Sequence, residues 1–88
     1  MNLMPTVIRK DGFQVVIWTN DHEPMHVHVF KAEGELVVNL GDSNSRVSVR
    51  DNFAMSNKNE RKALDIISEN QTFLRSKWME IYGKSKTR

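Results

Sequence analysis

Residues 26–40 read HVHVFKAEGELVVNL, two β-rich runs joined by a short polar segment that contains glycine. Branched and aromatic residues favour strands, and two such runs separated by a few turn residues are typical of a β-hairpin. We therefore predict strands over residues 26–30 and 35–40, connected by a turn at residues 31–34.

The alternation of side chains along a strand fixes the register of this hairpin. The two valines of the first run share one face, and its two histidines share the other. Pairing Phe30 with Glu35 across the turn places the apolar residues of both runs on one face: Val27, Val29, Leu36 and Val38. A slip of one residue would mix the two faces, so this register is the one we predict. The opposite face then carries a polar set that we expect to be exposed and to point away from the core: His26, His28, Glu35 and Asn39.

The flanking segments extend the sheet on both sides. Upstream, β-rich runs at residues 6–9 and 13–18 flank Lys10-Asp11-Gly12, and an Asp-Gly pair between such runs is a strong hairpin signal. Downstream, residues 46–50 alternate like a short edge strand after a polar turn. The pattern predicts about five short, mostly antiparallel strands, arranged as two hairpins plus an edge strand.

From Ser56 onward the apolar residues recur every three or four positions, whereas in the preceding segments they recur every two. Apolar residues recur at helical spacing: Ala63, Leu64, Ile67, Leu74, Trp78 and Ile81. We expect a cap at Ser56 or Asn57, a bend or break near residues 70–71, and an end at Gly83. Phe73 and Leu74 should join Trp78 in the core, with Trp18 packing near them. The fold class is α+β, with C-terminal helical segments packed against one face of the sheet.

Length and composition bound the possible classes of protein. Eighty-eight residues leave room for one domain, which we place at residues 1–83, followed by a basic tail at 84–88. The 39% of hydrophobic and 27% of charged residues are typical of a globular protein. The absence of cysteine excludes disulfides and thiolate metal sites and agrees with a cytoplasmic location. No apolar run is long enough to cross a membrane, so we expect no membrane partner.

The net charge of +2 depends on the end of the chain. Three of the thirteen basic residues are Lys84, Lys86 and Arg88. Without them the chain would contain ten basic and eleven acidic residues. The basicity is therefore a property of the tail, and it gives only weak support to a nucleic-acid partner.

The histidines are the one local feature that carries chemistry. His22, His26 and His28 lie within seven positions, and a His-x-His pair on a strand presents two imidazoles in one direction. Such a pair is a common start of a divalent metal site, for zinc or nickel, which His22, Asp21 or Glu35 would complete.

Two other interpretations of the histidines stay open. Imidazole serves as general base and acid near neutral pH, so His26 and His28 are also candidates for metal-free cleavage of RNA. Alternatively the histidines hydrogen-bond across the hairpin and have a structural role, while Asp21 and Pro24 hold the preceding turn. A glycine-rich phosphate loop, a paired-carboxylate motif and a Ser-His-Asp arrangement are all missing from the sequence, which gives no support to the conventional enzyme classes.

Several segments resemble a bacterial family of uncharacterised proteins known as domain of unknown function 4160. They are Met4-Pro5-Thr6-Val7, the run from Asn20 to Val29, Ser56-Asn57-Lys58, Glu69-Asn70 and the run from Leu74 to Trp78. The motif residues carried over by this resemblance are Asp21, His22, Pro24, His26 and His28. Two positions depart from the family pattern, since Met25 stands where a second proline is common and Val37 where a more polar residue is expected.

The resemblance implies a short prokaryotic protein, often encoded beside another small protein in toxin–antitoxin-like or regulatory gene pairs, with no established reaction. We therefore expect a small interaction or regulatory module whose partner is a small protein encoded by a neighbouring gene. Its functional surface is predicted at the segment Asp21–His28 together with Glu35 and Asn39.

Overall fold

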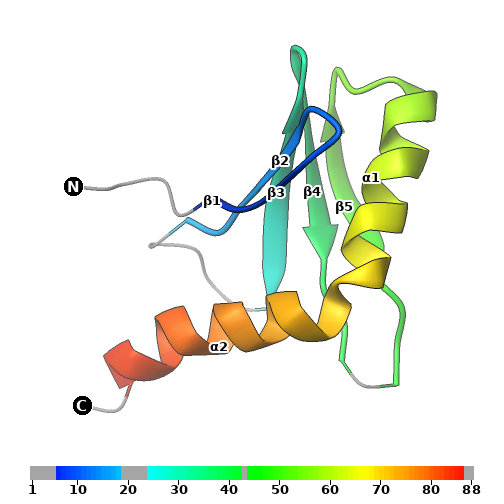
Figure 1. The fold of residues 1–88 in the computed structure, drawn as a ribbon. Coiled ribbons are helices and arrows are strands. Elements are labelled where there is room, and N and C mark those ends of the chain that lie inside the picture. The colour runs from blue at the N-terminus through cyan, green and yellow to red at the C-terminus, as the bar shows by residue number, and fades with distance from the viewer. Residues whose placement is uncertain (1–5, 19–23, 43, 87–88) are drawn as a thin grey trace.

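The computed structural model describes residues 6–18, 24–42 and 44–86, and within these ranges the chain forms one five-stranded sheet and two helices (Figure 1). The strands are β1 (Thr6–Lys10), β2 (Phe13–Val16), β3 (His26–Lys31), β4 (Gly34–Asn39) and β5 (Ser48–Phe53). The helices are α1 (Asn57–Glu69) and α2 (Gln71–Lys86). The strands lie in chain order and every neighbouring pair is antiparallel, which confirms the predicted α+β fold.

The β3–β4 hairpin has the predicted register. Val29 pairs with Leu36, Val27 with Val38, His28 with Val37 and His26 with Asn39. The turn is shorter than predicted, because Lys31 also pairs with Gly34 and leaves Ala32 and Glu33 alone outside the ladder. Ala32 adopts a positive φ of 54°, as the tight reversal requires.

The edge strand starts and ends later than the sequence indicates. Residues 46–50 were predicted, whereas β5 spans Ser48–Phe53 and its pairing with β4 shifts between Val37 and Val38. The shift inserts one extra residue into β5, a β-bulge that interrupts the alternation on which the prediction was based.

Both helices belong to one apolar layer against one face of the sheet. Figure 1 shows α1 lying along the sheet beside β4 and β5, and α2 turning across the ends of the strands. The core joins the inward residues of the strands to those of the helices: Phe13, Val15, Ile17, Val27, Val29, Leu36, Val38, Leu40, Met55, Ala63, Ile66, Ile67, Leu74 and Trp78. Trp78 is 1% exposed, as predicted, whereas Phe73 is 44% exposed and lies outside the core.

Side-chain caps fix the helix boundaries. The Ser56 hydroxyl accepts a hydrogen bond from the backbone N–H of Asn59 at the start of α1. Asn70 ends α1. Its backbone carbonyl accepts a hydrogen bond from the N–H of Leu74, and this bond closes the first turn of α2. The predicted break at residues 70–71 is confirmed. The predicted end at Gly83 is wrong, because α2 continues to Lys86.

Candidate functional site

The candidate site lies on the face of the sheet opposite to the one that α1 and α2 cover, and we call it the helix-free face. Strand pairing assigns three rows of described residues to this face: Gln14, Phe30, Glu35 and Phe53; Val16, His28, Val37 and Asp51; and His26, Asn39 and Ser48. The centroids of the two imidazole rings are 5.3 Å apart with an interplanar angle of 65°. His26 and His28 therefore share one face, opposite Val27 and Val29, as predicted.

His28 is oriented by a carboxylate. Its Nδ1 lies 2.9 Å from Oε2 of Glu35, the residue diagonal to it on β4. Because a carboxylate accepts hydrogen bonds, Nδ1–H donates, and the lone pair of the neutral imidazole is then on Nε2. This is the arrangement that orients histidines in metal sites and in catalytic dyads.

His26 is anchored in the same manner by the backbone. Its Nδ1 donates to the carbonyl oxygen of Pro24 over 2.8 Å, so the prediction that Pro24 belongs to this cluster is consistent with the geometry. In both histidines Nδ1 carries the proton of the neutral ring, and Nε2 is the atom suited to bind a metal or accept a proton.

Arg50 joins this cluster although sequence analysis did not select it. Its Nε donates to Oδ1 of Asn39 over 2.9 Å, and its Nη2 lies 3.4 Å from the carbonyl oxygen of Pro24. The alternation of side chains along a strand could not identify Arg50 as a site residue, because it does not reveal the bulge in β5 that places Arg50 here. A guanidinium therefore lies beside the histidines, where it can bind a carboxylate or a phosphate.

Trp18 was also placed wrongly by the sequence. We expected it near Trp78, but its ring meets His28 edge to face at 6.2 Å and Phe30 at 6.5 Å. Residue 18 is two positions beyond Val16, so strand alternation carries it to the same face as His28.

The helix-free face is less exposed to solvent than expected. His26 is only 5% exposed, and Val16 and Val37 are buried as well. The expectation of exposed imidazoles is therefore wrong for His26, whose ring packs edge to face against that of His28 and is held by the carbonyl of Pro24.

Two residues of the predicted set, Asp21 and His22, lie outside the described residues. Within residues 6–18, 24–42 and 44–86, no three histidine, aspartate or glutamate side chains are grouped to hold a metal ion. Of the three predicted metal ligands, His22, His26 and His28, the described residues therefore include two, His26 and His28. Over the same ranges, no helix has the length and apolar character needed to cross a membrane.

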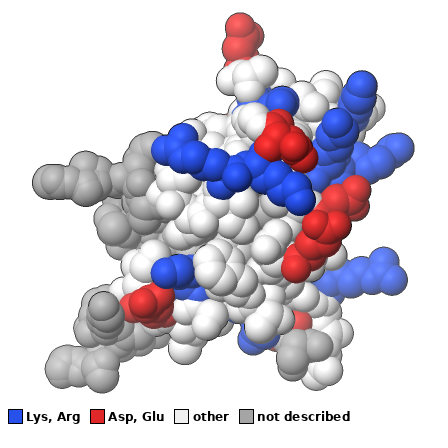
Figure 2. Space-filling view, in the orientation of Figure 1, with Lys and Arg blue, Asp and Glu red and all other residues white. Residues whose placement is uncertain are grey.

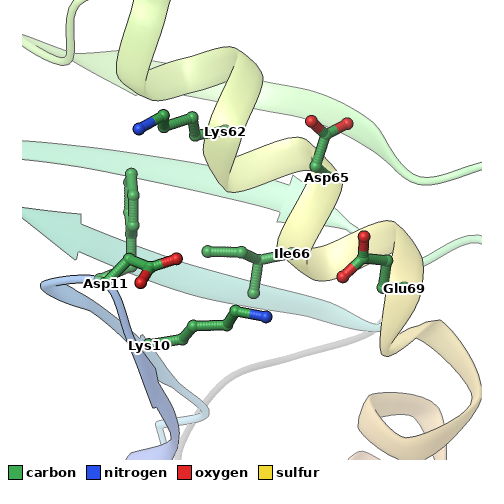
Figure 3. A pocket seen from close by; sticks show the side chains of 7 residues that line it. Lys10, Asp11, Lys62, Asp65, Ile66 and Glu69 are labelled. Carbon is green, nitrogen blue, oxygen red and sulfur yellow. The ribbon is translucent and has the colours of Figure 1, made fainter.

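A separate hollow lies between the β1–β2 turn and α1 (Figure 3). It has a volume of about 200 Å³ and is lined by Lys10, Asp11, Phe13, Lys62, Asp65, Ile66 and Glu69. Two ammonium groups and three carboxylates surround its apolar floor, a mixture that favours no single class of ligand. This hollow contains none of the predicted site residues.

Comparison with known proteins gives one match. The model of the family described as Domain of unknown function (DUF4160) matches residues 12–79. The chain belongs to this family. The DUF4160 match includes the whole β3–β4 hairpin, Trp18, Arg50 and most of α2, and therefore the complete candidate site. No curated protein and no solved structure matches the chain.

Proposed function

We propose that this DUF4160 protein is a small cytoplasmic interaction module that binds a protein partner through the helix-free face. The partner is a small protein encoded by a neighbouring gene, in a bacterial two-gene unit of the toxin–antitoxin-like or regulatory kind. The observation that supports this proposal is the set of partly or largely exposed aromatic residues on one face, Trp18, Phe30 and Phe53, placed around the charged groups of Glu35 and Arg50.

The composition of this surface agrees with a binding role. Aromatic residues and arginine are enriched at the centres of protein interfaces and supply most of their binding energy. Phe53 is 55% exposed and lies in the same cross-strand row as Phe30, so this face presents more than one isolated apolar side chain. Buried His26 and partly buried His28 fit beneath such a surface, because the anchors from Pro24 and Glu35 hold them in fixed orientations.

Matched phenylalanine variants test this proposal. The protein is purified with its neighbour-encoded partner, and the dissociation constant is measured by calorimetry for the wild type, Phe53→Ser and Phe73→Ser. Phe53 and Phe73 are both exposed, but Phe73 lies on α2. We expect Phe53→Ser to weaken binding by about tenfold or more, which corresponds to roughly 1.4 kcal/mol, and Phe73→Ser to leave it unchanged. Equal effects of the two variants, or no binding by the wild type, would contradict the proposal.

A His-dependent ribonuclease is a second candidate, and the His28–Glu35 pair is the observation that favours it. With Nδ1–H held by the carboxylate, Nε2 of His28 carries the lone pair that would accept a proton from a ribose hydroxyl, while Arg50 would bind the phosphate. Nε2 is buried in the free protein, so this reaction requires the face to open when RNA binds. We expect this activity to survive chelation of metals and to be lost in His28→Ala. Activity that persists in His28→Ala, or no cleavage by the wild type, excludes this candidate.

Metal binding is the third candidate, through Nε2 of His26 and His28 with His22 as the additional ligand. Calorimetry with zinc and with nickel at neutral pH is compared between the wild type and a His26→Ala/His28→Ala double variant. A genuine site would bind only in the wild type, weaken in mild acid as the imidazoles take up protons, and raise the melting temperature. Equal heats for the two proteins would place any metal elsewhere.

A further inference from the structure

The sheet ends in an unpaired edge at β5. The strands lie in chain order, so β5 pairs with β4 on one side, and among the residues that the structure describes no segment pairs with its outer side. Five of its six residues are exposed, and Val49 is partly buried. Alternate residues of an edge strand direct their backbone N–H and C=O groups outward. This edge can therefore accept the main chain of a further strand.

The long polar side chains of β5 do not protect this edge. Proteins commonly block an edge strand with charged side chains that project beyond it. The guanidinium of Arg50 is instead turned back over the sheet, to Asn39 on β4 and to the carbonyl oxygen of Pro24 before β3. The side-chain amide of Asn52 donates to Glu60 on α1 over 2.6 Å. Both side chains are therefore engaged within the chain, and neither obstructs an incoming strand.

The bulge in β5 leaves a regular segment of this edge. The pairing of β5 with β4 shifts only between Val37 and Val38, and residues 51–53 pair with β4 without interruption. A bulge opposes strand addition because it bends and twists the edge locally. The three residues beyond it lie within the ordinary length range of strands, so they can pair with a short strand of another protein.

The opposite edge of the sheet, β1, is less suited to this role. It ends in Arg9 and Lys10, two adjacent exposed residues of like charge. Figure 2 shows basic and acidic side chains intermingled over the β1–β2 turn and α1, beside this end of β1. Charged side chains at an edge oppose the addition of a strand. Of the two edges, β5 is therefore the more open to a partner.

We propose that the protein partner adds a β-strand to the outer edge of β5 and so extends the sheet. Main-chain hydrogen bonds along an exposed edge are a recurring way in which proteins bind an extended segment of another chain. The inference rests on the proposed function, because the added strand would continue the helix-free face on which we place the partner.

The side chains of Asp51 and Phe53 specify the chemistry of the added strand. Both are exposed, and strand pairing places both on the helix-free face. Asp51 forms no ion pair with any other residue in the described part of the chain. Side chains opposite each other on one face of a sheet lie about 5 Å apart and interact. We therefore expect a strand with a basic residue beside Asp51 and, two positions along, an apolar residue beside Phe53.

Isotope-filtered NMR of the complex with the neighbour-encoded partner tests this proposal. With the protein labelled with ¹³C and ¹⁵N and the partner unlabelled, we expect nuclear Overhauser effects between the Hα protons of residues 51–53 and backbone protons of the partner. Amide hydrogen exchange in the same complex should slow by about tenfold or more at alternate residues of β5, whose N–H groups point outward, and stay unchanged in β1.

A matched pair of charge variants tests the predicted chemistry of the added strand. Asp51→Lys should weaken binding of the partner by about tenfold or more, because it places two like charges side by side. Asp65→Lys makes the same change of charge at an exposed position on α1 and should leave the dissociation constant unchanged. Equal effects of the two variants would contradict the expected pairing at Asp51.

The outcomes separate strand addition from the proposed function. A complex that forms without backbone contacts or slowed exchange at β5 would overturn strand addition and leave binding through the helix-free face intact. No binding of the partner by the wild type would contradict both. Slowed exchange at β5 in the protein alone, increasing with its concentration, would show that a second copy of the chain occupies the edge and would also overturn the proposal.

Discussion

At the scale of single residues, Trp78 is the side chain whose loss should cost most. It is 1% exposed and belongs to the cluster that joins α2 to the sheet. We expect Trp78→Ala to lower the free energy of unfolding by about 3–5 kcal/mol, because truncation of a buried aromatic ring leaves a large cavity. Urea denaturation measures this change. Phe73→Ala, at an exposed position on the same helix, should change stability by about 0.5 kcal/mol or less, and equal losses would contradict the core assignment.

Asp42 gives a residue-scale prediction about pH. The backbone N–H of Asn44 and the hydroxyl of Ser45 hold the pKa of this carboxyl below its usual value of 3.8. A depressed pKa in the folded state means that the ionised carboxylate stabilises the fold above about pH 4, and that this contribution is lost as the pH falls through the folded pKa. Asp42→Asn should therefore melt at a slightly lower temperature than the wild type at pH 7, and the difference should disappear once the pH falls below the folded pKa. A difference that persists in acid would show that the charge is not the cause.

At the scale of elements, Gln71 links the first turn of α2 to the loop between β4 and β5. Its Nε2 lies 2.6 Å from the carbonyl oxygen of Leu40, 2.9 Å from that of Ser45 and 3.4 Å from that of Asp42. Gln71→Ala removes these hydrogen bonds, whereas Gln71→Glu also places a carboxylate against three carbonyl oxygens. We expect a loss of about 1–2 kcal/mol for alanine and a larger loss for glutamate at pH 7, measured by denaturant unfolding. Glutamate as stable as glutamine would contradict this assignment of the amide.

The sequence predicts elements well where a repeating pattern has a single physical cause. The β3–β4 register was predictable because a slip would have exposed the valines, and the helix break was predictable from the polar pair at residues 70–71. The limits of β5 were not, because a bulge breaks the alternation of the strand. The end of α2 was not, because a glycine within a helix costs only about 1 kcal/mol, which neighbouring interactions can offset.

The candidate site was predictable only in part. Alternation placed His26, His28, Glu35 and Asn39 on one face, and the structure bears this out. Arg50 and Trp18 reach this face from segments distant in sequence, and the burial of His26 depends on packing between strands. Local patterns carry no information about either effect.

At the scale of the whole molecule, the sheet separates two surfaces of different character. One face is covered by α1 and α2, whose buried residues form the core with the inward residues of the strands. The other face presents aromatic residues around Arg50 and Glu35.

The central claim is that the helix-free face binds the protein partner, and amide chemical-shift mapping tests it most directly. The ¹⁵N-labelled protein is titrated with its neighbour-encoded partner, and shifts are followed at every backbone amide. The largest changes should fall on β3, β4 and β5, around Phe30, Arg50 and Phe53, with small changes on α1 and α2. Changes confined to the helices and to the β1–β2 turn, with the helix-free face unaffected, would contradict the claim.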